Sequence, residues 1–220
     1  MGRVVRAMAV SRAEQREATR QALLAEGQRR FAADGYHHVV LADVARGAGV
    51  TKGAAYHHFD SKAGLFRAVL AEVQQELGEC VATAAERHKD PWEQLRAGCR
   101  AFLAAGTDPA VRQILLVDAP SVLDWDEWRA LDEEHSARHL TEALAALAAT
   151  GTIADQPVEP LARLLSGAMN EAALWIARGG DLRAAEQALD RLLTGLHTPH
   201  RRPPTAPPRP QPTPSEQRGH

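Results

Sequence analysis

The sequence predicts an all-α protein: an N-terminal three-helix helix-turn-helix domain, joined by a long helix to a C-terminal helical bundle. Apolar residues make up 45% of the 220 residues and aromatic residues only 5%. The apolar residues recur at three- and four-residue spacing, and nothing resembles the alternation of a strand. Residues 41–62 have the pattern of two short helices around a glycine corner. This length allows one or two domains with a sizeable core.

Composition narrows the classes of function. No apolar run approaches the roughly 20 residues of a membrane span, and no signal peptide opens the chain, so we expect a cytoplasmic protein without a membrane partner. Cys80 and Cys99 lack the spacing of a metal or redox pair, which predicts two buried free thiols.

Charge divides the chain into two parts. Residues 1–62 hold 10 Lys and Arg against 6 Asp and Glu, a net charge of +4, whereas the remainder holds 16 against 22, a net charge of −6. A basic N-terminal part on an acidic body indicates that a polyanion contacts the N-terminal part only.

Residues 1–12 carry three arginines and no acid, so they form either a disordered tail or a basic arm that reaches DNA. The DNA-binding domain follows at residues 13–62. Its first helix is predicted over residues 13–33, and its buried stripe consists of Leu23, Leu24, Gly27 and Phe31. Asp34 and Gly35 end that helix, and Tyr36 should pack back on the domain.

The motif at residues 41–62 reads as a helix-turn-helix. Leu41, Val44, Ala45 and Ala48 recur on one helical face. Gly49 supplies the left-handed backbone of the corner, Val50 fills its interior and Thr51 caps the second helix. In such a motif the second helix enters the major groove by its N-terminal end. The predicted DNA-binding residues are Thr51, Lys52, Gly53, Ala54, Tyr56, His57, His58 and Lys62.

The chemistry of these side chains suits a groove. Gly53 and Ala54 let the backbone approach closely, and Ala54 or Ala55 could touch a thymine methyl. Lys52 suits a guanine edge or a phosphate, although it could instead be a solvated surface lysine. The two histidines could alternatively cap or pack the end of the helix, and Phe59 is expected in the core.

The pattern F-x-x-x-G-Y, followed by D-V-A-x-x-A-G-V-T-K-G-x-x-Y-x-H-F-x-S-K-x-x-L, spans residues 31–65 and resembles the TetR family of bacterial repressors. The resemblance covers residues 13–75. It implies a homodimer that binds operator DNA, with the effector pocket and the dimer interface in the C-terminal helices. It also implies that Tyr56, His58 and Lys62 contact the DNA backbone.

Two departures from the family pattern stand out. Val39 and Val40 occupy positions where a hydroxyl residue normally caps the first motif helix and touches a phosphate, so we expect fewer phosphate contacts there. Glu26 and Arg30 replace apolar residues in the first helix. Neither change removes a residue of the recognition helix.

Residues 63–198 form the predicted effector-binding and dimerisation domain. Ser61 begins a helix over residues 62–87 with an apolar stripe. This continuous helix should link the DNA-binding domain mechanically to the C-terminal helices. Further helices are predicted over residues 91–105, 110–117 and 124–149, with Pro120 interrupting the chain between the last two.

Proline-broken helices beside a long helix favour a cavity. The candidate effector pocket consists of Phe102, Leu103, Leu116, Trp125, Trp128, His135, His139, Asn170 and Trp175. Solid core is the alternative for the aromatic residues. His135 and His139 lie four residues apart and, with Asp132 or Glu142, could bind a metal, form a polar lining of the pocket, or be ordinary surface or core histidines. We predict no metal site, cofactor or catalytic residue.

Two amphipathic helices over residues 161–176 and 181–196 suit a four-helix interface between two copies of the chain. The predicted interface residues are Leu161, Leu165, Ala168, Ala172, Ala185, Leu189, Leu192 and Leu196. Burial within one subunit is the alternative. Residues 199–220 hold 8 prolines and should form a disordered tail.

The sequence thus predicts a homodimeric transcriptional repressor that an unknown small-molecule effector releases from double-stranded operator DNA. An activator or a ligand-independent DNA-binding regulator on the same fold is the alternative. A helical-bundle enzyme using His135 and His139 is more remote, since no nucleophile motif or phosphate loop is present.

Overall fold

The computed structural model describes residues 11–198, without the side chains of residues 125–126 and 129–137. The predicted arm before residue 11 and the tail from residue 199 lie outside the described residues, as do the side chains of Trp125 and His135. Within the described range the chain is helical, and its one β pairing is an isolated bridge between Ile153 and His197. The predicted all-α class is confirmed.

The elements before α4 form the N-terminal domain, which we call the head. It begins with α1, Arg12–Asp34, and continues through the short 3-10 helix η1, Tyr36–His38. A capping box fixes the start of α1: the Ser11 Oγ accepts from the Glu14 N–H at 3.1 Å, and the Glu14 carboxylate accepts from the Ser11 N–H at 2.6 Å. The predicted stripe of Leu23, Leu24, Gly27 and Phe31 is buried. The ring of Tyr36 packs on Phe31 and Phe66 at centroid distances of 6.0 and 5.0 Å, as expected.

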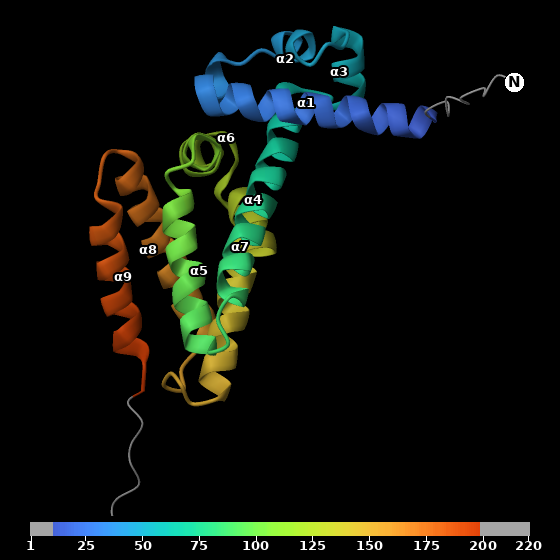
Figure 1. Cartoon of the computed structure of the whole chain (residues 1–220). Coiled ribbons are helices and arrows are strands. Elements are labelled where there is room, and N and C mark those ends of the chain that lie inside the picture. Colours follow the sequence, from blue (N-terminus) through green and yellow to red (C-terminus); the bar gives the residue numbers. More distant parts are fainter. Residues whose placement is uncertain (1–10, 199–220) are drawn as a thin grey trace, which may run out of the picture.

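The helix-turn-helix has the predicted corner. Helix α2 spans Leu41–Gly47, and α3 spans Lys52–His58. Gly49 between them has φ 71°, a conformation that residues with a Cβ rarely adopt. The Thr51 Oγ accepts from the Ala54 N–H at 3.1 Å and so caps α3. The two helices lie against α1 at one end of the molecule (Figure 1).

Helix α4, Lys62–Glu86, connects the head with the body. Ser61 caps it by accepting from the Gly64 N–H at 3.0 Å. The helix runs from beneath α1 down one side of the bundle (Figure 1), and 25 residues correspond to a length of roughly 37 Å. Its predicted apolar stripe is buried, but so is Gln74, which the apolar pattern did not single out.

The body contains α5, Pro91–Ala105, the π-helix η2, Val111–Asp118, and the short α6, Ala119–Val122. The break predicted at Pro120 is wrong, because η2 runs directly into α6. Pro120 lies at the junction of the two, and the helical backbone continues through it to Val122. The chain breaks instead at Leu123, where Asp124 caps the next helix by accepting from the Glu127 N–H at 2.8 Å.

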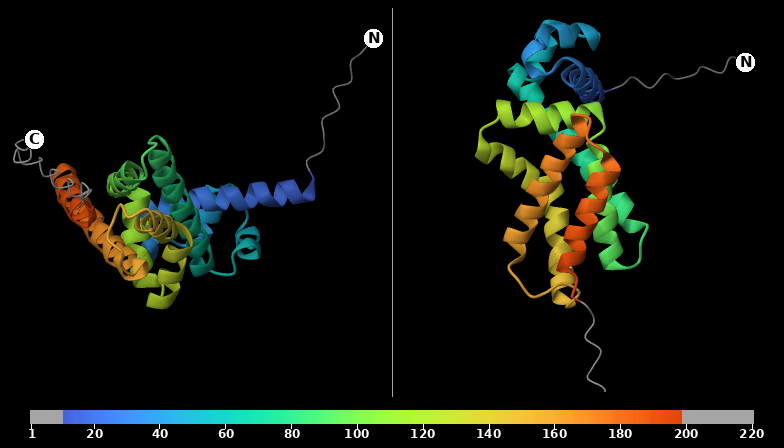
Figure 2. Two further views of the ribbon diagram at one scale, coloured as in Figure 1. Left: turned by 90° about the horizontal axis from the view of Figure 1, so that it is seen from below. Right: turned by 90° about the vertical axis from the view of Figure 1, so that its left-hand side faces the viewer.

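The long helix α7, Trp125–Ala149, precedes α8, Val158–Ala177, and α9, Leu182–Leu196. Gly151 and Gly179 end α7 and α8 with φ 70° and 100°. Seen from the side, the head sits on one end of the bundle, with α8 and α9 side by side along its outer flank (Figure 2).

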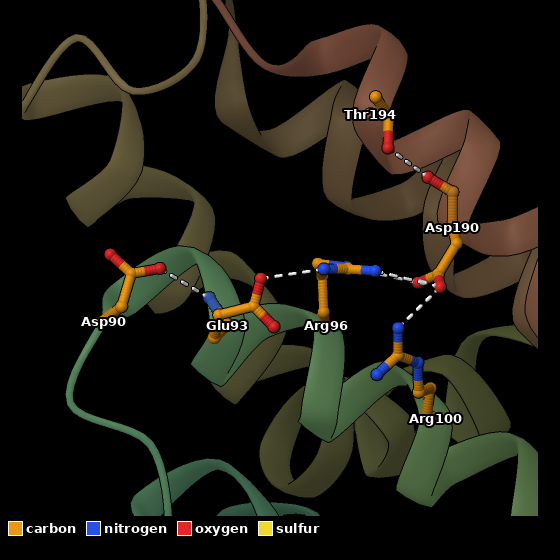
Figure 3. A network of polar contacts seen from close by, with 6 residues as sticks. All are labelled: Asp90, Glu93, Arg96, Arg100, Asp190 and Thr194. Carbon is orange, nitrogen blue, oxygen red and sulfur yellow. Dashed lines mark hydrogen bonds and ion pairs between the residues drawn. The ribbon is translucent and has the colours of Figure 1, made fainter.

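An ion-pair network fastens α9 to α5 (Figure 3). Arg96 donates to the Asp190 carboxylate at 3.0 and 3.3 Å, and Arg100 donates to it at 2.5 Å. Burial alone would raise the pKa of Asp190, but the hydrogen bonds from the two guanidinium groups outweigh it and the pKa is lowered. Cys99 is buried on α5, and burial followed by the charge of Asp190 raises its pKa to about 12. Cys80 is exposed, so the prediction of a buried thiol is wrong there.

Candidate nucleic-acid interface and ligand cavity

The N-terminal part of α3 presents small and basic groups to solvent. Thr51, Lys52 and Gly53 are exposed, and Ala54 is half-buried. Nothing but the Thr51 Oγ comes within 4.0 Å of where a Gly53 Cβ would stand, so the backbone there is open to a close neighbour. This is the arrangement that a helix needs to approach the floor of a groove.

One of the two alternatives for the thymine contact is wrong. Ala55 has an exposed fraction of 0% and belongs to the buried hydrophobic core. Phe59 is buried beside it, as predicted. Of the two alanines, only Ala54 remains available to a base.

The aromatic and histidine side chains lie at the C-terminal part of α3. Tyr56 has an exposed fraction of 45%, and the Lys52 Nζ lies 5.7 Å from the centroid of its ring. His57 is exposed and His58 half-buried, in the predicted order. Burial, followed by the positive charge of Arg16, lowers the pKa of His58, so this ring is neutral at pH 7.

Lys62 is already engaged within the protein. Its Nζ donates to the carbonyl oxygen of Tyr36 at 2.9 Å and lies 4.2 Å from the centroid of the Tyr36 ring. An ammonium group has three N–H donors, so one carbonyl does not exhaust it. Lys62 therefore anchors the start of α4 to η1, whether or not it also meets a phosphate.

The two sequence departures have clear structural counterparts. Val40 occupies the N-cap of α2 with an exposed fraction of 55%. It makes no side-chain hydrogen bond, because a valine side chain has no polar atom. Glu26 accepts hydrogen bonds from Arg29 and Arg30 at 2.6–2.8 Å. The Arg29 bond outweighs the effect of burial, and with the Arg30 bond it lowers the pKa of Glu26 to about 2.

A polar contact joins the head to the body at Tyr36. Its backbone N–H donates to the Asp118 Oδ2 at 2.7 Å, and the Gln113 Nε2 donates to the Asp118 Oδ1 at 3.0 Å. Asp118 is only 5% exposed. Arg67 on α4 also pairs with Glu127 at the start of α7. No sequence pattern points to the Asp118 contact, because its partners are 82 residues apart.

A cavity of about 240 Å³ lies between α4, α5, α7 and α8. Its lining is mainly apolar and comprises Val81, Ala82, Ala85, Glu86, Gln94, Leu95, Gly98, Cys99, Phe102, His139, Leu140, Ala143 and Met169. A second cavity of about 260 Å³ lies between α4 and α7, lined by Gln74, Gln75, Gly78, Glu79, Ala82, Arg138 and His139. Ala82 and His139 border both cavities.

Two residues of the predicted pocket, Phe102 and His139, line the first cavity. The other members with described side chains are not among its lining residues; they are Leu103, Leu116, Trp128, Asn170 and Trp175. Sequence reasoning missed Gln74, Gln94 and Met169, because a helical period shows that a residue faces inward without showing whether it meets another side chain or a void. Within the described part of the chain, no three His, Cys, Asp or Glu residues could together hold a metal ion.

The predicted dimer residues fall into three groups by their burial. Leu165, Ala185 and Leu189 are buried within the chain, and Leu161, Ala172 and Leu196 are half-buried. Ala168 and Leu192 are exposed, Leu192 with an exposed fraction of 58%. Leu164 and Trp175 of α8 are also exposed, with fractions of 74% and 48%. Both helices therefore carry apolar residues on their outer faces as well as on their inner faces.

A helix-turn-helix head carried on a helical body with an internal cavity defines the class of helix-turn-helix transcriptional regulators. Two family models match in agreement with this division: one described as "Bacterial regulatory proteins, tetR family" over residues 23–69, and one described as "Tetracyclin repressor-like, C-terminal domain" over residues 92–196. A crystal structure of a TetR-family transcriptional regulator from Pectobacterium atrosepticum is 34% identical, with a TM-score of 0.69, and the match covers 86% of this chain and 98% of that one.

The chain belongs to the TetR family of transcriptional regulators. Curated relatives include the HTH-type transcriptional regulator SrpR of Pseudomonas putida, 41% identical over 32% of this chain and 33% of the relative. The probable acrEF/envCD operon repressor of Escherichia coli is 40% identical over 36% of each chain. The match thus spans about a third of the length of these curated relatives. Among the described helices, none has the length and apolar character required to cross a membrane.

Proposed function

We propose that this protein is a homodimeric, non-catalytic repressor that binds operator DNA through α3 and leaves it when a small molecule fills the cavity behind α4. The observation that carries the proposal concerns α4, which is separated from α3 only by residues 59–61 and also lines the cavity. The N-terminal part of α3 is exposed and rich in small residues. Head and cavity occupy different parts of the molecule, so a bound ligand would act through the helices between them.

The outer faces of α8 and α9 support a dimer. Leu164, Trp175 and Leu192 are large apolar side chains left exposed on the two helices. A contact with a second copy would cover these side chains, and two antiparallel helices from each copy would form a four-helix contact. A two-fold dimer would present two α3 helices to successive half-sites of an operator.

Ligand control follows from differential binding. A molecule in the cavity shifts the protein only toward the conformation that it binds better. If that conformation holds the two heads at a spacing that no longer matches successive major grooves, operator affinity falls. Ligand binding and DNA binding would then each lower the affinity for the other, although the two sites are separate.

The test is binding of the protein to labelled DNA from upstream of its own gene, measured by fluorescence anisotropy at several salt concentrations. Lys52→Ala combined with Tyr56→Ala should weaken binding by about tenfold or more. It should lower the salt dependence by about one ion if Lys52 meets a phosphate, because the hydroxyl of Tyr56 is uncharged. Lys89→Ala is the control, because Lys89 is exposed in the loop between α4 and α5. Unchanged binding by the double variant would refute the assigned reading surface. A reporter whose expression rises with the protein would identify an activator instead.

A further inference from the structure

Gln74 is a buried amide without a hydrogen-bond partner. It lies midway along α4 with an exposed fraction of 0%, and neither its Oε1 nor its Nε2 has a partner among the described residues. Buried side-chain polar atoms are nearly always paired, so an amide with both ends unpaired is an exception that calls for a physical explanation.

The surroundings of Gln74 supply one, because its side chain lines the second cavity. Gly78 and Ala82 follow it at four-residue spacing on the same face of α4, and both also line this cavity. These two residues are too small to reach the amide. Among the described residues, none supplies the amide with a hydrogen-bond partner, and a ligand could take that role.

The second cavity is a neighbour of the first. Ala82 of α4 and His139 of α7 border both, so the two spaces lie on either side of these residues. From Gln74 to Ala85, which lines the first cavity, α4 advances by roughly 16 Å. A molecule that used both spaces would be elongated, with one end near Gln74 and the other among Leu95, Phe102 and Met169.

The charges indicate what kind of group meets Gln74. Glu79 and Arg138 line the same cavity but are exposed, and each faces a charge or an amide of its own helix: Glu79 accepts from Gln75, and Arg138 pairs with Glu142. The charged groups therefore stand at the mouth, whereas the buried end offers a neutral amide that both donates and accepts. Among the described side chains, none at this end would supply a counter-ion to a charged group.

We infer that Gln74 anchors the effector. The effector is then an uncharged, elongated molecule with an apolar tail and a polar end that carries both a hydrogen-bond donor and an acceptor, such as a carboxamide or lactam. The inference rests on the proposed function, because it takes the cavities to be the effector site. Gln74 is thereby the residue that selects for the polar end of the ligand.

The test uses a matched pair of probes, 4-butylbenzamide and 1-butyl-4-isopropylbenzene, which differ in that an isopropyl group replaces the carboxamide. Binding to the full-length protein is measured by isothermal titration calorimetry for the wild type and for Gln74→Met. Gln21→Met is the control, because Gln21 is exposed on α1 and donates to Glu17. Melting temperature without a ligand is measured for all three proteins.

The wild type should bind the benzamide, and Gln74→Met should bind it about tenfold more weakly. The affinity for the hydrocarbon should change by less than about threefold. Since methionine removes two unpaired polar atoms from the interior, the melting temperature of Gln74→Met should equal or exceed that of the wild type. If Gln74 were purely structural, the result would be the opposite: Gln74→Met would have a lower melting temperature than the wild type and would lose affinity equally for both probes.

Failure to bind the benzamide, or equal benzamide affinity in the wild type and in Gln74→Met, would overturn the inference. A DNA-release assay separates this from the proposed function. Benzamide binding that depends on Gln74 but leaves the DNA complex intact would support the inference and refute ligand release by this site. DNA release by the benzamide that is unchanged in Gln74→Met would support ligand release and overturn the role of Gln74.

Discussion

Replacing Asp118 by alanine should destabilise the protein and weaken the connection between head and body. The Asp118 carboxylate accepts the Tyr36 N–H at 2.7 Å and the Gln113 Nε2 at 3.0 Å, in a site where Asp118 is only 5% exposed. Alanine removes both acceptors at once. The Tyr36 N–H then remains in the contact between η1 and η2 without a partner.

The magnitude follows from these two bonds. A hydrogen bond to a charged group contributes about 1.5–3 kcal/mol, and relief from burying the carboxylate offsets part of that loss. We therefore expect the free energy of unfolding to fall by about 2–3 kcal/mol, and the melting temperature by about 5–10 °C for a chain of this size. Asp118→Asn should fall between the wild type and Asp118→Ala, since its amide keeps one acceptor oxygen.

Urea unfolding followed by circular dichroism measures the first effect. Asp155→Ala is the matched control, because Asp155 is exposed, and its unfolding free energy should change by less than about 0.5 kcal/mol. The second effect is measured as the ratio of operator affinities with and without ligand, which should move toward one in Asp118→Ala. A variant as stable as the wild type, with an unchanged ratio, would refute this account of the contact.

Three further predictions concern the head and the dimer. Because the pKa of Glu26 is lowered to about 2, the contribution of Glu26 to stability is complete above its unfolded pKa near 4.5 and is lost as the pH falls toward 2. The difference in melting temperature between the wild type and Glu26→Gln should therefore narrow over that range. A difference that stays constant would contradict this account. Val40→Thr adds an N-cap acceptor to α2 and should raise the unfolding free energy by about 0.5–1 kcal/mol in urea, with Val117→Thr, exposed outside any cap, as its control. Leu192→Glu should convert the proposed dimer to a monomer in sedimentation velocity, whereas Arg191→Glu beside it should not. A dimer in both variants would place the interface elsewhere.

Much of the head could be predicted because its signals are local. The positive φ of Gly49 and the caps by Thr51 and Ser61 depend on residues within a few positions of each other. The buried face of α1 follows from its apolar spacing, with Leu23 and Phe31 both fully buried. Local chemistry of this kind is visible in a sequence before any tertiary contact is known.

The errors come from tertiary packing. Ala55 and Ala54 are chemically identical, and only the docking of α3 on the head buries one of them. Pro120 breaks a helix in most contexts, but here it falls in the first turn of α6. Cys80 lies on the exposed side of α4, although its surroundings in the sequence are apolar.

The dimer prediction shows a further limit of periodicity. Helices α8 and α9 are apolar on two faces, and one stripe packs inside the chain through Leu165 and Leu189 while another leaves Leu164 and Leu192 exposed. The spacing of apolar residues along a helix shows that such faces exist, but it does not say which one the protein's own core covers. The assignment needs the tertiary positions of α5 and α7, which pack against these helices in the folded chain.

Tyr36 is the point at which a ligand signal can become a change in the head. Its backbone N–H is held by Asp118 of η2, and its carbonyl oxygen is held by Lys62 at the start of α4. The two bonds fix η1, and with it the helix-turn-helix, to two elements of the body at once. A ligand that moves α4 relative to η2 must stretch one of these bonds or turn the head to keep both. Under the proposed ligand control, a ligand that fills the cavity without moving α4 would leave both bonds intact, and we expect it to leave the orientation of the head within its own subunit unchanged.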